Sequence, residues 1–184
     1  MERSQLDDGG GRLLVITGPP GAGKSTVAAL VADRFEPSAL VEGDAFFAFL
    51  QRGRVDPWLP ESNEQNDVVI RAAASAAGRF ASRGYTAVFD GVIGPWFLPA
   101  FAAETGLDRL DYVVLLPTVE RCLEGVGIRV GHGFTDEAAT RKMHREFAAA
   151  AIDDRHMLRD PPTGPEAVAT VIIDHMRAGV FTYP

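Results

Sequence analysis

A glycine-rich segment near the start of the chain constrains the fold more than any other feature. It fits the pattern G-x-x-x-x-G-K-[ST], in which backbone N–H groups and one lysine surround a polyphosphate. An apolar run over residues 13–17 precedes the segment, and apolar residues at helical spacing follow it from Lys24 to Phe35. The segment therefore joins a buried strand to a helix, as a phosphate-binding loop requires. Its residues are Gly18, Pro19, Pro20, Gly21, Ala22, Gly23, Lys24, Ser25 and Thr26.

The alternative is an ordinary glycine-rich turn between a strand and a helix. The use of lysine favours the phosphate-binding interpretation, because only Lys24 and Lys142 occur in a chain that otherwise uses arginine for its cations. We therefore expect the loop to bind ATP, with Lys24 reaching the β- and γ-phosphates and Ser25 binding Mg²⁺.

The rest of the chain alternates between short apolar runs and helical patterns. This alternation predicts a three-layer α/β/α P-loop NTPase fold, with about five parallel strands and a helical lid. The predicted strands are residues 13–17, 39–41, 86–89 and 112–116, with a short edge strand near 156–158. The predicted helices are residues 24–35, 45–50, 64–83, a helix from 119, one capped by Asp136 that runs to 151, and 167–176.

Two aspartates follow predicted strands and should lie at the edge of the sheet that holds the loop. Asp90 directly follows the third strand, which is the position of an acid that holds Mg²⁺ directly or through water. Asp44 follows the second strand and opens an aromatic helix, which suits a base that orients an acceptor hydroxyl. Taken alone, each aspartate is better explained as a helix cap or a turn residue. Their position beside the phosphate loop favours the functional interpretation.

Composition narrows the class of protein. The 184 residues suit one domain, expected over residues 12–184 after a flexible lead-in at 1–11. A net charge of -7 argues against binding nucleic acid or a membrane surface, and no apolar run is long enough to span a bilayer. With Cys122 as the one cysteine and no signal peptide, we expect a cytoplasmic monomer or homodimer.

The phosphate loop, Gly43-Asp44 and the run from Ala87 to Gly91 together resemble the small-molecule kinases related to gluconate kinase and chloramphenicol phosphotransferase. These belong to the P-loop proteins that are similar to nucleoside-monophosphate kinases. The resemblance extends loosely from Arg12 to Met176. It implies transfer of the γ-phosphate of ATP to a small-molecule hydroxyl, with Asp44 as the base.

The resemblance also implies a lid over residues 125–147. A run from Arg129 to Gly133 is similar to the Arg-x-x-His of gluconate-kinase-like enzymes, so Arg129 is expected to close over the phosphates. Relatives usually carry a second arginine one turn earlier, where this chain has residues 124–127 without one. Arg121 or Arg145 could supply the missing nucleotide contact, and the glycines at 125, 127, 131 and 133 would let the segment move.

Aromatic residues near the same strand ends could wall a pocket for a bulky, partly apolar acceptor such as an antibiotic or a nucleoside-like compound. The alternative is that they belong to the core. They are Phe46, Phe47, Phe49, Trp58, Trp96 and Phe97. Two other functions remain open: a nucleoside or nucleotide kinase, and a non-catalytic sensor that binds ATP.

Overall fold

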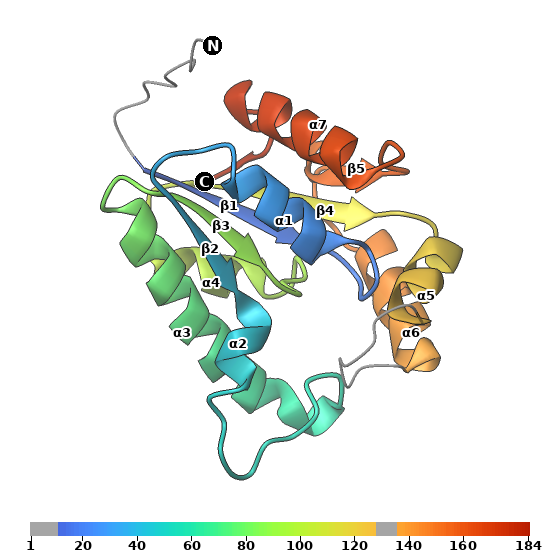
Figure 1. Ribbon diagram of the computed structural model, residues 1–184. Helices are drawn as coiled ribbons and strands as arrows, with labels where there is room; N and C mark the ends of the chain where they lie inside the picture. Colours follow the sequence, from blue (N-terminus) through green and yellow to red (C-terminus); the bar gives the residue numbers. More distant parts are fainter. Residues whose placement is uncertain (1–10, 128–135) are drawn as a thin grey trace.

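The computed structural model describes residues 11–127 and 136–184, which form a sheet between two layers of helices (Figure 1). The strands are β1 (Arg12–Thr17), β2 (Ser38–Glu42), β3 (Thr86–Asp90), β4 (Leu110–Leu116), β5 (Met157–Arg159) and β6 (Thr182–Tyr183). The helices are α1 (Lys24–Ala32), α2 (Gly43–Phe47), α3 (Asn63–Ala81), α4 (Leu98–Thr105), α5 (Val119–Gly127), α6 (Glu137–Ala148) and α7 (Pro165–Arg177). Single 3₁₀ turns occur at Pro60–Ser62 and Asp154–His156.

The strand order is β2-β3-β1-β4-β5, with all five strands parallel, and β6 adds an antiparallel pair to the start of β4. This confirms the predicted α/β class and the parallel sheet of about five strands. Because β1 lies between β3 and β4, the loop that leaves β1 emerges beside the carboxyl ends of both neighbours. Ligands of such sheets bind at this edge.

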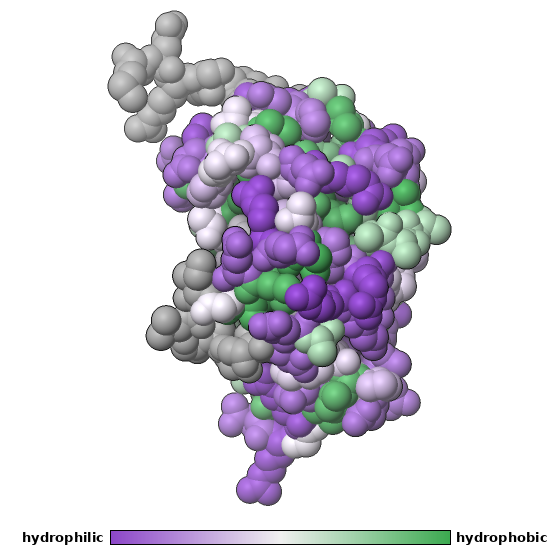
Figure 2. Space-filling view, turned by 90° about the vertical axis from the view of Figure 1, so that its right-hand side faces the viewer, coloured by the Kyte–Doolittle hydropathy of each residue, from purple (hydrophilic) through white to green (hydrophobic). Residues whose placement is uncertain are grey.

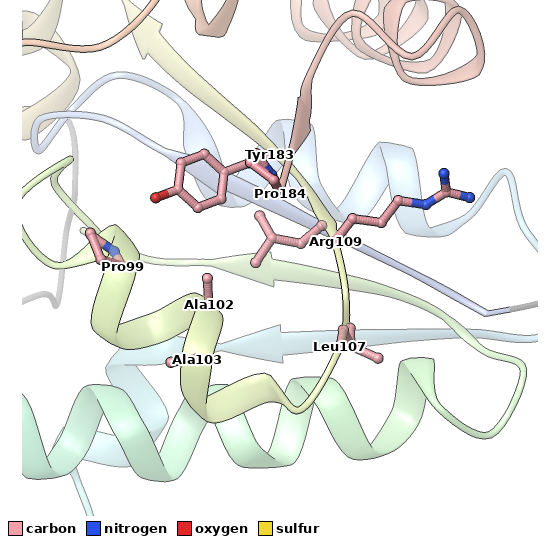
Figure 3. Close-up of a pocket in the computed structure, with 8 residues that line it drawn as sticks. Pro99, Ala102, Ala103, Leu107, Arg109, Tyr183 and Pro184 are labelled. Atoms are coloured by element: carbon pink, nitrogen blue, oxygen red, sulfur yellow. The ribbon is translucent and has the colours of Figure 1, made fainter.

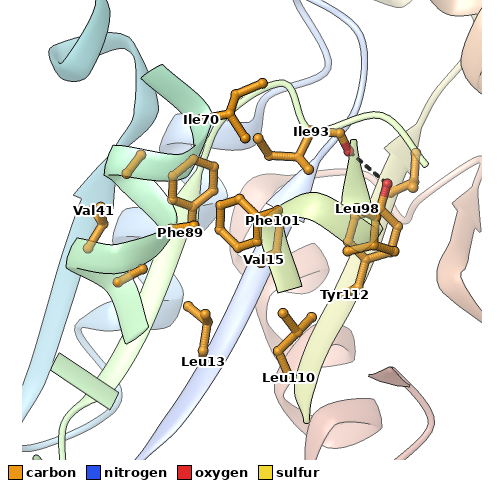
Figure 4. Close-up of a cluster of buried hydrophobic side chains, with 14 of the residues drawn as sticks. Leu13, Val15, Val41, Ile70, Phe89, Ile93, Leu98, Phe101, Leu110 and Tyr112 are labelled. Atoms are coloured by element: carbon orange, nitrogen blue, oxygen red, sulfur yellow. Dashed lines mark hydrogen bonds between the residues drawn. The ribbon is translucent and has the colours of Figure 1, made fainter. Parts of the chain in front are cut away.

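Each face of the sheet is covered because side chains alternate along a strand. Leu13 and Val15 of β1 pack in the cluster beneath α3 and α4, whereas Leu14 and Ile16 pack in the cluster beneath α1 and α7. Figure 4 shows the first cluster, in which the rings of Phe89 and Phe101 meet edge to face with centroids 4.9 Å apart. A strand buried on both faces must be apolar throughout, which explains the continuous apolar run of β1.

The helices on the right of Figure 1 turn their apolar residues inward. Figure 2 shows this face, on which hydrophilic residues dominate and hydrophobic ones form small separate spots. Ile172 of α7 and Phe147 of α6 are fully buried. Among the helices of the described part of the chain, none has the length and hydropathy needed to cross a bilayer.

Every predicted strand and helix in the described residues is present, with ends that differ by a few residues. Asp136 caps α6 as expected, accepting a hydrogen bond from the N–H of Ala139 at 3.0 Å. The sequence analysis did not predict α4 or β6. The short α4 has signals of its own, because Pro99 lies in its first turn and Gly106 ends it with a φ of 67°.

Candidate functional site

The glycine-rich segment forms a tight loop between β1 and α1. Three of its glycines have positive φ values, 142° at Gly18, 78° at Gly21 and 87° at Gly23, which residues with a Cβ rarely adopt. A hydrogen bond from the N–H of Ala22 to the carbonyl of Pro19 closes the loop at 3.3 Å. The next amides then open α1, so that the loop and the positive end of a helix dipole coincide.

The two side chains that were assigned to phosphate and metal begin α1. Lys24 is only 5% exposed, and its Nζ donates to the carbonyl of Pro19 at 3.0 Å, which holds a charged group beneath the loop. Ser25 and Thr26 are exposed in the same turn. The structure therefore brings together a buried ammonium, free hydroxyls and a helix N-terminus, a combination suited to a polyphosphate.

Asp90 and Asp44 both lie at the edge of the sheet that carries the loop. In register, Asp90 pairs with Ile16 of β1 on one side and with Glu42 of β2 on the other. Asp90 is 8% exposed, and its Oδ1 is buried without a hydrogen-bond partner among the described residues. Asp44 is exposed in the first turn of α2. One carboxylate is thus buried close to β1, and the other faces solvent further along the edge.

The segment that follows Asp90 is fixed by two buried side chains that the sequence analysis missed. The N–H of Ile93 donates to Oγ1 of Thr17 at 2.8 Å. The hydroxyl of Tyr112 donates to the carbonyl of Ile93 at 2.7 Å, and Figure 4 shows this second bond. Thr17 and Tyr112 come from β1 and β4, and both are fully buried. No sequence pattern links these residues, because their contact depends on how the strands are ordered.

The predicted arginines lie around α5 and α6. Arg121 is exposed in the first turns of α5, and Arg141 and Arg145 are exposed on α6. Arg129 lies outside the described residues, as does the middle of the expected lid. Arg121 and Arg145, the two candidates for the second arginine, are thus both exposed.

Although its arginines face solvent, α6 is anchored to the domain. The Nε2 of His144 donates to the carbonyl of Pro117 at 2.8 Å, directly after β4. Phe147 is fully buried, and its ring lies 5.4 Å from that of Trp96 in the segment before α4. The helix of the expected lid thus contacts the segment that leaves Asp90.

The aromatic residues divide between the two alternatives. Phe46 and Phe97 pack against the core cluster. Phe49 and Trp96, in contrast, are 71% and 49% exposed. Two further exposed apolar side chains, Leu59 and Val92, belong to segments that follow β2 and β3. Large apolar side chains are therefore exposed in the segments that follow β2 and β3, the two strands at whose carboxyl ends the aspartates lie, which fits an apolar ligand.

Comparisons with known proteins establish the fold. No known family and no curated protein matches the sequence, but solved structures match most of the chain. A sugar kinase from Janibacter sp. is 22% identical, with 93% of this chain and 94% of that one covered and a TM-score of 0.66. The tunicamycin resistance protein of Deinococcus radiodurans is 18% identical, with 95% and 99% covered and a TM-score of 0.66. Shikimate kinase from Acinetobacter baumannii is 16% identical, with 97% and 98% covered and a TM-score of 0.61.

The chain has the fold of the P-loop kinases. In this fold the segment from Gly18 to Ser25 occupies the turn after the first strand, and the carboxyl edge of the sheet carries both aspartates.

The P-loop kinase fold of this chain also has a pocket at the opposite edge of the sheet. It has a volume of about 290 Å³ and lies between α4 and the pair formed by β4 and β6 (Figure 3). Its wall includes Ala102, Leu107 and Tyr183, and the Arg109 side chain extends away from the α4 side. Because Leu110 and Tyr183 pair at the start of β4, this pocket is remote from the phosphate loop and belongs to no site described above.

Proposed function

We propose that this chain is an ATP-dependent phosphotransferase that moves the γ-phosphate of MgATP onto a hydroxyl of a small molecule. One observation carries the proposal. A phosphate-binding loop that buries Lys24 lies beside Asp90, whose carboxylate has a buried oxygen without a partner among the described residues. Burying an unpaired carboxylate oxygen is unfavourable unless a ligand satisfies it.

The residues fit a magnesium site in which the protein and the phosphates of the nucleotide both supply ligands to the ion. Mg²⁺ takes oxygen ligands and is commonly held by one or two protein groups together with phosphates and water. Ser25 offers a hydroxyl at the start of α1, and Asp90 offers the unpartnered oxygen. Bound there, the ion would neutralise charge on the β- and γ-phosphates.

The protein's own groups would divide the work of transfer. The loop amides and Lys24 hold the phosphates, and Arg129 would add positive charge from the lid. The oxygen of the acceptor hydroxyl bonds to the γ-phosphorus, and the bond between the γ-phosphorus and the oxygen that leaves with ADP breaks. Asp44 accepts the proton that the hydroxyl gives up. The exposure of Asp44 suits this role, because the base must reach a molecule that arrives from solvent.

The acceptor class follows from the exposed apolar side chains. Phe49 and Trp96 offer rings to a ligand, which fits an acceptor with a bulky apolar body better than a polyhydroxy acid. The resemblance to chloramphenicol phosphotransferase and the name of one structural neighbour, a tunicamycin resistance protein, are consistent with a drug-like or nucleoside-like acceptor.

The test is transfer of labelled γ-phosphate from MgATP to a panel of antibiotics, nucleosides and sugar acids. Lys24→Ala is the blank, because it removes the buried ammonium. We expect a labelled product that disappears in this variant. If the wild-type chain binds MgATP but labels no compound, the result favours a non-catalytic ATP-binding sensor over a phosphotransferase.

Asp44→Asn separates an enzyme from a sensor. As an exposed residue it can change without a packing penalty. We expect phosphate transfer to fall at least a hundredfold, within the range by which positioned bases accelerate reactions, while MgATP affinity stays within about twofold. Unchanged transfer would remove Asp44 from the mechanism.

A further inference from the structure

The phosphate loop lies directly on α5, and two glycines make this contact. The Cα of Gly21 faces the backbone of α5 so closely that a Cβ there would collide with the carbonyl oxygen of Cys122. In return, a Cβ on Gly125 would collide with the carbonyl oxygen of Gly21. The backbone at Gly21 therefore lies flat against one turn of α5, from Cys122 to Gly125.

This contact requires a glycine at 125, because any side chain there would collide with the loop. A Cβ on Gly127, the last residue of the same helix, would meet no described atom beyond the helix's own backbone within 4 Å. Alanine favours a helix over glycine at both positions, but only at position 125 does the added methyl group meet backbone that cannot turn away. Of the two glycines of α5, Gly125 is thus the one whose hydrogen atom is needed for the contact with the phosphate loop.

The site of this contact is close to the charge that is expected to hold phosphate. Cys122 is fully buried, and its burial raises the pKa of the thiol to about 11, against the opposing effect of the nearby charges of Lys24 and Arg121. The turn of α5 that carries Cys122 thus contacts the loop at Gly21 and lies near the charge of Lys24.

We propose that Gly125 is a positioning residue for the nucleotide: by letting the backbone at Gly21 rest on α5, it holds the loop amides in the arrangement that binds phosphate. The inference rests on the proposed function, because it concerns the same loop. It adds that α5, which contributes no residue of the phosphate-binding pattern, determines the geometry of that pattern.

Gly125→Ala tests the proposal, with MgADP as the probe and titration calorimetry as the measurement. The added methyl group should lift the loop from α5 and weaken MgADP binding at least tenfold. Gly127→Ala is the matched control in the same helix, and its affinity should stay within twofold of the wild type. Equal affinities for the Gly125→Ala variant and the wild type would overturn the inference.

A second control separates positioning from general loss of stability. A Cβ on Gly78 of α3 would collide with the carbonyl oxygen of Thr105 in α4, which is the same kind of contact between helices remote from the loop. Gly78→Ala should lower the melting temperature and leave MgADP affinity within twofold. If it weakens MgADP as much as Gly125→Ala does, the effect is global and the inference is wrong.

The single cysteine gives a further readout that does not depend on enzymatic activity. Because Cys122 is buried beneath the loop, its reaction with a thiol reagent such as DTNB requires local opening. Saturating MgADP should slow this reaction at least tenfold, and Gly125→Ala should accelerate it while Gly127→Ala does not. If MgADP does not change the rate at which Cys122 reacts with DTNB, the proposed contact of the loop with α5 is contradicted.

These outcomes are distinguishable from failure of the proposed function. A wild-type chain that binds no MgADP overturns both proposals. If MgADP binding depends on Gly125 but no acceptor is phosphorylated, the positioning role of Gly125 is supported. Only the proposed kinase activity is then refuted.

Discussion

The two hydrogen bonds at Ile93 allow a stability prediction that follows directly from geometry. Thr17→Val keeps the shape of a fully buried side chain and removes the oxygen that accepts the N–H of Ile93 at 2.8 Å. Tyr112→Phe removes the hydroxyl that donates to the carbonyl of Ile93 at 2.7 Å. Burial raises the pKa of Tyr112 above its usual value, so its hydroxyl stays protonated and donates at any working pH.

The expected magnitudes differ between the two variants. Losing a hydrogen bond to a buried neutral partner costs about 1 kcal/mol, and leaving a buried group without any partner costs about 1–3 kcal/mol. Thr17→Val removes the acceptor of the buried N–H of Ile93 and should cost about 2 kcal/mol of unfolding free energy. Tyr112→Phe should cost about 1–2 kcal/mol, because an under-satisfied carbonyl is better tolerated. In a domain of this size each 1 kcal/mol lowers the melting temperature by roughly 2–4 °C.

Urea unfolding at constant temperature is the assay, with the m-value as a check that unfolding stays two-state. Tyr85→Phe is the control, because Tyr85 is 37% exposed and should change the unfolding free energy by less than about 0.5 kcal/mol. The double variant should cost less than the sum of the single variants, since both groups fix one residue. Losses below about 0.5 kcal/mol in both single variants would refute the argument that these bonds hold the segment.

Three further predictions concern the core, the site and pH. Phe101→Ala removes a fully buried ring in contact with Phe89 and should cost about 3–5 kcal/mol in urea unfolding; a loss under 1 kcal/mol would contradict this packing. Asp90→Ala should abolish the Mg²⁺ dependence of nucleotide affinity in calorimetry, whereas an unchanged dependence would exclude Asp90 as a ligand. Burial lowers the pKa of His156, so the unfolded chain takes up this proton first and stability should fall as pH drops below about 6.5. His156→Gln should flatten this fall in urea midpoints measured between pH 7.5 and 5, and an equal slope in both proteins would refute it.

Local sequence determined the elements that carry the candidate site. The apolar run of β1, the glycine pattern and the apolar spacing of α1 each act over a few residues, so the strand, the loop and the helix were predictable. The same holds for Asp136, whose side chain caps a helix three residues away. The placement of Asp44 and Asp90 at one edge also followed, because parallel strands that alternate with helices share a carboxyl edge.

The very short strand β6 and the burial of individual aromatic side chains were less predictable from the sequence. With two residues, β6 carries no period of its own and exists because Leu110 and Asp111 leave an edge to pair with. The aromatic residues after β2 and β3 have the same chemical character, yet Phe97 packs on the core while its neighbour Trp96 is half exposed. Composition cannot distinguish two such rings, because their burial depends on what packs above them.

Tertiary structure alone decided how distant segments meet at the loop. Thr17, Ile93 and Tyr112 come together because β1 lies between β3 and β4, an order that no local pattern determines. Gly21 and Gly125 are far apart in sequence, and the need for a hydrogen atom at each appears only when the loop and α5 approach within contact distance. The sequence thus determined which groups can bind a phosphate, and packing between distant backbone segments decided the geometry in which they are held.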